Sequence, residues 1–121
     1  MSACILVVDD DISVRTLVSA ALSSRGYEVT QAVDGRMGVA YVQDAPEHYK
    51  LILIDYRMPE IDGLAAIRVI LELAPEAPVI LMSTEDIQVD LDELGVREFL
   101  PKPFEAGDLI RLVERHFDHS N

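Results

Sequence analysis

The sequence predicts an α/β domain in which helices cover both faces of a five-stranded, doubly wound parallel sheet. Short apolar runs alternate with longer stretches of helical spacing along all 121 residues, and this alternation is typical of parallel sheets. Several of the runs are apolar at every position rather than at every second one, as in strands buried on both faces. Strand order must reverse somewhere in such a sheet, and we expect the ligand crevice at that reversal.

The first two predicted strands flank a helix. Residues 4–8 (CILVV) form a buried strand that ends in three aspartates. Residues 27–32 (YEVTQA) alternate in polarity, as a strand nearer the edge of the sheet does, and Gly26 is placed to end the helix before them. That helix is predicted by apolar residues three and four positions apart, namely Val14, Leu17, Val18, Ala21 and Leu22.

The third predicted strand is the run LILI at residues 51–54, which ends abruptly in Asp55. The Asp34-Gly35 pair before it signals a turn, and residues 36–45 have the spacing of a short helix. A carboxylate at the C-terminal end of a buried strand lies where open α/β sheets bind ligands. The sequence therefore directs attention to Asp55.

The second half of the chain is expected to continue the alternation. Residues 64–73 and 104–117 each have apolar residues along one helical face, and residues 79–82 and 96–100 are the fourth and fifth predicted strands. Residues 85–93 are acidic and only weakly periodic. We therefore expect a short or irregular fourth helix there.

Composition excludes several functional classes. The chain has 10 basic and 22 acidic residues, a net charge of −12, which argues against direct nucleic-acid binding because phosphate contacts need clustered Lys and Arg. Its one cysteine, Cys4, cannot form an internal disulfide. No apolar run has the length of a membrane span, and the N-terminus lacks the basic region of a signal peptide. These features favour a soluble, cytoplasmic protein with no membrane attachment.

Polar side chains able to do chemistry follow four of the predicted strands. Because the carboxyl ends of parallel strands lie at one edge of a sheet, three carboxylates converge there if the first and third strands are neighbours. Such a cluster of like charges requires a cation or a retained proton, and oxygen ligands of this kind suit Mg²⁺. The side chains at this edge are those of Asp9, Asp10, Asp55, Ser83 and Lys102.

This set of side chains predicts phosphoryl chemistry. Asp55 is placed to act as a nucleophile that forms an acyl phosphate. Lys102 supplies a compact positive charge for one phosphoryl oxygen, and Ser83 supplies a hydroxyl donor for another. Catalysis would then consist of in-line positioning and of charge neutralisation by the metal and the lysine.

Four motifs carry a family resemblance: ILVVDDD, LILIDYRMPEIDG, PVILMST and FLPKPF, in this order and at suitable spacing. With them the whole chain resembles a response-regulator receiver domain of two-component signalling. The resemblance implies a flavodoxin-like strand order 2-1-3-4-5 and a single receiver domain over residues 1–121. It also implies a phosphoprotein that promotes its own phosphorylation and dephosphorylation, without turnover of a separate substrate.

The resemblance also assigns the acceptor and its metal ligands. Asp55 would accept a phosphoryl group from a sensor histidine kinase or a histidine phosphotransfer protein, and Lys102 would bind that group. The implied ligands of Mg²⁺ are Asp9, Asp10, Asp55 and the backbone carbonyl of Arg57.

A conformational switch is part of the same resemblance. Ser83 would be the switch hydroxyl and Phe99 the switch aromatic, which turns inward and changes the face built by helix 4, strand 5 and helix 5. The family usually has a cis peptide at the position of Lys102-Pro103. Other interpretations of these residues stay open. Phe99 could be an ordinary core residue, Thr84 could be the switch hydroxyl in place of Ser83, and Asp11 could serve only as a helix cap.

Partners are implied only by class. The kinase is expected to contact the first helix around Ile12, Arg15 and Thr16 and the loop at Pro103-Phe104. The output is an unknown downstream protein or a missing effector domain. The final residues contain no linker, which favours a single-domain regulator. Receivers often dimerise through the face of helices 4 and 5, so a homodimer stays open.

Two departures from the family pattern bear on these expectations. Thr84 follows the switch hydroxyl where a small residue is common, so it could restrict access of the phosphoryl group. The segment between Ser83 and Phe99 is shorter than usual and rich in acids. We also expect Arg57 to pair with Glu85 across the site and to slow hydrolysis.

Two other functions compete with the receiver interpretation. One is a Mg²⁺-dependent phosphatase with an aspartyl-phosphate intermediate, but such enzymes usually have a second aspartate where this chain has Arg57. The other is a constitutive interaction module of the same fold that no longer switches. The complete set of acids, hydroxyl and lysine argues against this second alternative.

Overall fold

The computed structural model describes residues 3–57, 63–84 and 91–117, where strands and helices alternate along the chain. The strands are β1 (Cys4–Val8), β2 (Glu28–Ala32), β3 (Tyr49–Asp55), β4 (Val79–Ser83) and β5 (Glu98–Pro101). The helices are α1 (Ile12–Ser23), α2 (Gly35–Asp44), α3 (Gly63–Leu73), α4 (Leu91–Leu94) and α5 (Ala106–Phe117).

The five strands form one sheet in the order β2-β1-β3-β4-β5, and every pair of neighbours is parallel. This confirms the predicted fold class and strand order. The order reverses at β1, so the crevice between the carboxyl ends of β1 and β3 is the expected ligand position.

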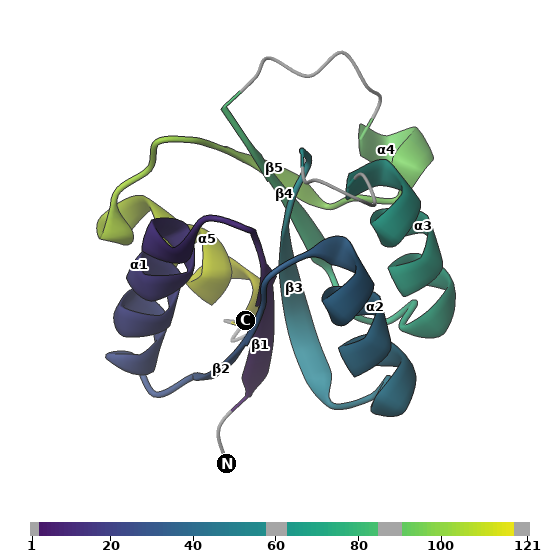
Figure 1. Cartoon of the computed structure of the whole chain (residues 1–121). Helices are drawn as coiled ribbons and strands as arrows, with labels where there is room; N and C mark the ends of the chain where they lie inside the picture. The colour runs from purple at the N-terminus through teal and green to yellow at the C-terminus, as the bar shows by residue number, and fades with distance from the viewer. Residues whose placement is uncertain (1–2, 58–62, 85–90, 118–121) are drawn as a thin grey trace.

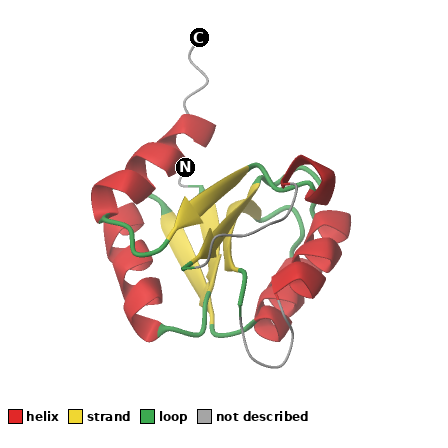
Figure 2. Ribbon diagram, turned by 90° about the horizontal axis from the view of Figure 1, so that it is seen from above, coloured by secondary structure: helices red, strands yellow, loops and turns green. Residues whose placement is uncertain are grey.

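Helices cover both faces of the sheet (Figure 1). α1 and α5 lie on one face, whereas α2, α3 and α4 lie on the other, and the view from above shows the sheet between the two layers (Figure 2). Successive residues of the central strands therefore enter different cores: Ile5 and Val7 pack under α1 and α5, and Leu6 and Val8 pack under α2 and α3. Burial on both faces explains why these strands are apolar at every position.

Local signals fix the starts of α1 and α2 and the end of α1. Asp11 caps α1 by accepting a hydrogen bond from the backbone N–H of Ser13 at 2.9 Å, and Asp34 caps α2 through Met37 at 2.8 Å. The cap interpretation of Asp11 is thereby confirmed. Gly26, with φ of 90°, follows the end of α1 in the left-handed region that glycine tolerates.

Three predicted starts differ from the structure by two residues, whereas other boundaries outside the fourth helix differ by at most one. β3 begins two residues earlier than predicted because Tyr49 is buried in the core, while the exposed Lys50 interrupts the apolar run. β5 begins at Glu98 rather than at residue 96. α5 begins at Ala106 rather than at residue 104. Just before the helix, the N–H of Glu105 donates a hydrogen bond to the carboxylate of Asp108 at 3.2 Å.

The fourth helix is described over four residues only, Leu91–Leu94. The rest of the predicted segment 85–93, including Glu85, lies outside the described residues, and so do its contacts. Within the described ranges, no helix combines the length and the apolar character that crossing a bilayer requires.

Candidate functional site

An acidic pocket lies at the carboxyl edge of the sheet, between β1 and β3. Val8 pairs with Ile54 in the strand register, so the next residue of each strand, Asp9 and Asp55, reaches the same edge. Asp9 is 0% exposed and Asp55 is 6% exposed, whereas Asp10 is at the surface. Carboxylate oxygens of the three acids lie within 4.8 Å of one another. The predicted convergence of the three carboxylates is therefore present.

Lys102 joins two of these acids. Its Nζ lies 2.7 Å from Oδ2 of Asp9 and 3.4 Å from Oδ1 of Asp55. The lysine follows β5, and its backbone N–H donates to the carbonyl of Ser83 at 2.8 Å. The peptide bond after it, Lys102-Pro103, is cis, as predicted. One ammonium group thus faces two buried carboxylates.

The pocket changes the acidity of both partners. Burial, followed by the charge of Asp9, raises the pKa of Asp55 to about 6, although Lys102 and the backbone N–H of Arg57 act in the opposite direction. Burial lowers the pKa of Lys102, but its contacts with Asp9 and Asp55 outweigh that effect and leave the pKa above the ordinary value. At neutral pH the pocket therefore holds an ionised lysine beside a mostly ionised Asp55.

The chemistry of the pocket fits a hard cation. All three donors are carboxylates, the ligands that Mg²⁺ prefers. Apart from its ion pair with Lys102, the buried Oδ2 of Asp9 receives no hydrogen bond from the described part of the chain. An acidic group that is buried and incompletely satisfied is suited to a metal ligand.

The two hydroxyl side chains at the end of β4 differ in exposure. Ser83 is buried as the last residue of the strand, whereas Thr84 is exposed and lines a cavity. β4 is tied to β3 at this level by a hydrogen bond of 2.9 Å from the N–H of Tyr56 to the carbonyl of Met82. Ser83 therefore lies at the same sheet edge as Asp55.

Phe99 lies on β5, and Arg57 lies two residues after Asp55. Phe99 is partly buried on β5 and packs against the core beneath α2 and α3. Arg57 is exposed, with its guanidinium carbon 5.7 Å from the centre of the Tyr56 ring. The expected pairing of Arg57 with Glu85 lies outside the described residues.

Arg15 was misjudged from the sequence. It was expected at the surface as a contact for the kinase, but it is only 8% exposed. Its guanidinium donates to the backbone carbonyl of Asp9 at 2.8 Å. The helical spacing contained the signal, because Arg15 lies three and seven residues before Val18 and Leu22, which are both fully buried on α1.

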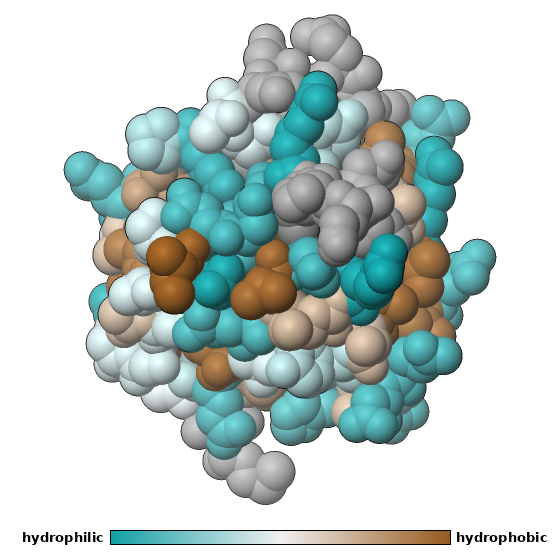
Figure 3. All heavy atoms as spheres, in the orientation of Figure 1, coloured by the Kyte–Doolittle hydropathy of each residue, from teal (hydrophilic) through white to brown (hydrophobic). Residues whose placement is uncertain are grey.

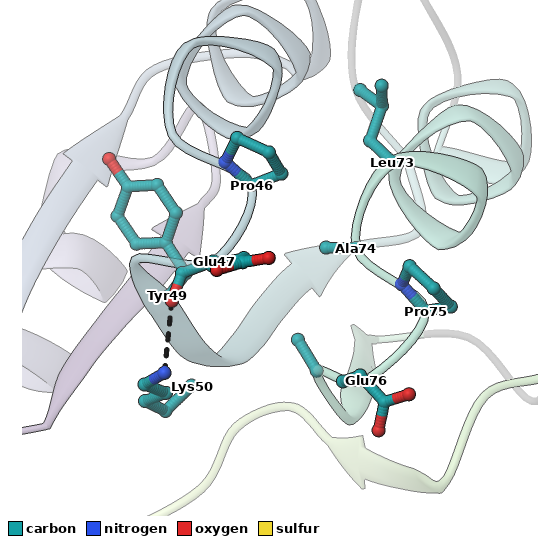
Figure 4. A pocket seen from close by; sticks show the side chains of 9 residues that line it. Pro46, Glu47, Tyr49, Lys50, Leu73, Ala74, Pro75 and Glu76 are labelled. Carbon is teal, nitrogen blue, oxygen red and sulfur yellow. Dashed lines mark hydrogen bonds between the residues drawn. The ribbon is translucent and has the colours of Figure 1, made fainter.

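Two cavities of about 410 Å³ lie at different places on the molecule. One adjoins the acidic pocket, and the other lies at the amino ends of β3 and β4, where Lys50 Nζ donates to the carbonyl of Glu47 at 3.0 Å (Figure 4). The first is lined by Asp11, Ser13, Val14, Leu17, Thr84, Lys102, Pro103 and Phe104.

The surface carries scattered apolar side chains among hydrophilic ones, as Figure 3 shows for one face. The exposed large hydrophobic residues of the described chain are Ile12, Val33, Met37, Tyr41 and Val69. Ile12, at 66% exposure, lies at the start of α1, beside the cavity that adjoins the pocket.

Comparison with known proteins identifies relatives over most of the chain. A family model described as the response regulator receiver domain matches residues 5–114. Transcriptional regulatory protein ZraR of Escherichia coli (strain K12) is 36% identical over 120 residues, which are 97% of this chain and 27% of ZraR. The DNA-binding transcriptional regulator NtrC of Salmonella typhimurium is 36% identical over 93% of this chain and 24% of NtrC. The chain thus spans about a quarter of the length of these curated relatives.

Solved structures share the fold over nearly the whole chain. A CheY-like receiver domain protein from Methanospirillum hungatei JF-1 has a TM-score of 0.91 and 25% identity, covering 98% of this chain and 95% of that one. The chemotaxis protein CheY4 of Vibrio cholerae has a TM-score of 0.86 and 31% identity, covering 95% and 98%. A BeF3-activated DrrB receiver domain has a TM-score of 0.84 and 27% identity, covering 98% and 100%.

Proposed function

Because the chain belongs to the response regulator receiver domain family of two-component signalling, we propose that it is a phosphorylation-switched module with Asp55 as phosphoacceptor. One observation carries this proposal: a buried Asp55 with a lysine ammonium 3.4 Å away and two further carboxylates beside it. We take residues 1–121 as one receiver domain. Family membership makes the chain a signalling module rather than an enzyme with its own substrate.

The proposed step is transfer of a phosphoryl group to a carboxylate oxygen of Asp55. The oxygen attacks phosphorus, an acyl-phosphate bond forms, and the bond from phosphorus to the donor nitrogen breaks, leaving its electron pair on that nitrogen. Lys102 Nζ, already near Asp55 Oδ1, would bind one of the phosphoryl oxygens. Positioning and charge neutralisation account for most of the catalysis in reactions of this kind.

Asp9, Asp10 and Asp55 would hold Mg²⁺, with the backbone carbonyl of Arg57 as a further ligand. When bound, the ion supplies positive charge that offsets the charge of the phosphoryl oxygens. Lys102 would then move from Asp9 toward the phosphoryl group, since Asp9 gains a new partner.

The output would begin at Ser83 and Phe99. In our proposal the Ser83 hydroxyl moves to a phosphoryl oxygen, and Phe99 turns into the space that becomes available. Phe99 lies on β5 between Glu98 and Leu100, and Glu98 binds α5 through Arg115 at 2.6 Å. A change at Phe99 would therefore reach the face built by α4, β5 and α5.

The phosphoryl donor would be a sensor histidine kinase or a histidine phosphotransfer protein, in the cytoplasm. We propose that it docks beside the cavity at the acidic pocket, against Ile12 and Thr16 of α1 and the Pro103-Phe104 loop. The downstream partner is a separate protein or an attached effector domain. ZraR and NtrC are named as transcriptional regulators, and they extend well beyond the part that this chain matches.

Intact mass after incubation with acetyl phosphate tests the proposal. We expect one added phosphoryl group in the presence of Mg²⁺ and none with a chelator or in Asp55→Asn. Asp11→Asn is the matched control, because it alters a neighbouring acid while asparagine still caps α1, and it should be phosphorylated as the wild type is. No uptake by the wild type under any condition would contradict the proposal and favour the constitutive interaction module.

A further inference from the structure

Four polar or charged side chains are buried in the part of the chain that is described, and the proposed function uses three of them. Asp9 and Asp55 belong to the acidic pocket and Ser83 ends β4 at the same edge of the sheet, whereas Arg15 lies on α1. Removal of a guanidinium from water is costly unless its donors and its charge are compensated. The burial of Arg15 therefore calls for a physical reason.

The contacts of Arg15 are made to neutral oxygens. Its Nη1 donates to the backbone carbonyl of Asp9 at 2.8 Å, and its Nε donates to Oε1 of Gln31 at 3.1 Å. Gln31 is itself held through Ser19, whose hydroxyl accepts from Gln31 Nε2 at 2.9 Å. Among the described residues, the guanidinium forms no ion pair with a carboxylate. The Arg15 guanidinium therefore contacts the backbone of the pocket residue Asp9, and no carboxylate of the described chain neutralises its charge.

The carbonyl that Arg15 binds belongs to the peptide between Asp9 and Asp10. A peptide unit is planar, so fixing its oxygen fixes the direction in which the chain enters the next residue. The other side of Asp9 is fixed by its N–H, which donates to the carbonyl of Ala32 at 3.1 Å. The exposed Asp10 makes no side-chain hydrogen bond or ion pair within the described chain. Its position thus depends on the backbone before it.

We propose that Arg15 is a positioning residue for the metal centre: by holding the Asp9-Asp10 peptide, it aims the Asp10 carboxylate at the cation. This inference rests on the proposed function, because it takes Asp10 as a ligand of Mg²⁺. Groups that orient metal ligands without touching the ion commonly change metal affinity by about 10- to 100-fold when they are removed.

The geometry favours arginine over lysine at this position. Two nitrogens of one planar guanidinium reach two acceptors, the carbonyl of Asp9 just after β1 and the side chain of Gln31 on the neighbouring β2. A lysine ammonium is a single compact charge on a flexible stem and does not reproduce this fork. Arg15→Lys should therefore recover only part of what Arg15→Gln loses.

Calorimetric titration of the full chain with Mg²⁺ tests the inference. We expect Arg15→Gln to weaken Mg²⁺ binding about 10-fold and Gln31→Ala about 2- to 3-fold, because Gln31 supports the guanidinium without touching Asp9. The matched control is Arg25→Gln, which removes an exposed arginine just beyond α1 and its contact with Glu114. The control should bind Mg²⁺ as the wild type does.

A second readout separates positioning from a general loss of structure. If Arg15 acts through Asp10, a high concentration of Mg²⁺ should restore most of the phosphorylation rate of Arg15→Gln. Gln31 is exposed, so Gln31→Ala should fold even if Arg15→Gln does not. Unchanged Mg²⁺ affinity in the variants, or no Mg²⁺ binding by the wild type, would overturn the inference.

The two proposals fail in different ways. Mg²⁺ binding that depends on Arg15, without phosphoryl uptake on Asp55, would reject the proposed function and keep the positioning role. The opposite result is phosphoryl uptake on Asp55, with Mg²⁺ affinity lost in Asp10→Asn but not in Arg15→Gln. It would support the proposed function and reject the positioning role of Arg15.

Discussion

The two edges of the sheet carry cavities of similar volume but different chemistry. At the carboxyl edge the cavity adjoins Lys102 and the buried acids Asp9 and Asp55, whereas at the amino edge the charged side chains Glu47 and Lys50 are exposed. Cavity volume therefore does not distinguish a functional site in this molecule. Buried charge does, because a fold retains it only where its cost is offset or used.

Loss of the lysine at the carboxyl edge should have the largest effect. Lys102→Met leaves Asp9 and Asp55 buried without a cation, so we expect a loss of about 3 kcal/mol in the free energy of unfolding at pH 7. Lys50→Met makes the same substitution at an exposed lysine of the amino edge and should change the free energy of unfolding little. Urea unfolding without Mg²⁺ measures both, and equal effects would break the contrast between the edges.

Removal of a carboxylate from the pocket should stabilise the protein. A pKa of about 6 for Asp55 lies above the unfolded value, so the folded state binds more protons between about pH 4 and pH 6, and stability falls as pH rises through this window. Asp55→Asn removes this cost. The shift corresponds to about 3 kcal/mol at neutral pH, and this net value already includes the favourable contact with Lys102.

We therefore expect Asp55→Asn to raise the free energy of unfolding by about 2 to 3 kcal/mol at pH 7 without Mg²⁺. The gain should shrink toward pH 4. Glu47→Gln at the amino edge provides the comparison and should show no such pH dependence. A destabilised Asp55→Asn would mean that the pocket, like an ordinary ion pair, favours the charged carboxylate.

Protons and Mg²⁺ should compete for the carboxyl edge. With a pKa of about 6, Asp55 is mostly protonated at pH 5, so Mg²⁺ binding should weaken about 10-fold between pH 7 and pH 5. Carboxyl NMR of the metal-free protein gives the pKa directly. Asp11 is the internal comparison, because hydrogen bonds from Ser13 lower its pKa. If Asp55 and Asp11 titrated with the same midpoint, burial would not raise the pKa of Asp55.

The smallest effect is expected from a change in α2 where it packs against Val8 of β1. A Cβ at position 38 would lie 2.8 Å from Cγ2 of Val8, next to Asp9, whereas a Cβ at position 107 would meet only the end of Arg111 at 3.4 Å. Gly38→Ala should cost about 1 kcal/mol, since overpacking exceeds the gain in helix propensity. Gly107→Ala should stabilise α5 slightly. Thermal unfolding compares the two, and a stabilised Gly38→Ala would show that α2 moves away freely.

Much of the fold was predictable because the spacing of apolar residues and the polar residues that end each strand are local signals in the sequence. The central strands are apolar throughout, and Asp9, Asp55 and Ser83 lie at or next to their ends, so their meeting at one edge followed from parallel pairing. The start of β3 was wrong because Lys50 points to solvent from a strand whose neighbour Tyr49 is buried. The early start predicted for α5 ignored the side chain of Asp108, which binds the N–H of Glu105 before the helix.

Arg15 shows where such prediction fails. A single arginine on a helix is usually at the surface, and its burial depends on acceptors supplied by Asp9 and by Gln31, which is 16 residues away. Those partners become visible only when β1 and β2 are paired. Ser83 is buried as the last residue of β4 and Thr84 is exposed beyond it, and the choice of Ser83 as the switch hydroxyl stays a prediction.

The pairing of Val8 with Ile54 has a consequence for how such chains can change in length. The two acids are aligned because residues 5–8 pair one for one with residues 51–54, whereas β3 has an extra residue, Lys50, between the partners of Cys4 and Ile5. A one-residue deletion between Leu51 and Ile54 would turn the side chain of Asp55 to the opposite face of the sheet. Insertions and deletions can therefore accumulate in the connections at the amino edge, such as the loop before Tyr49. Within residues 5–8 or 51–54, the loss of a single codon would separate the two acids.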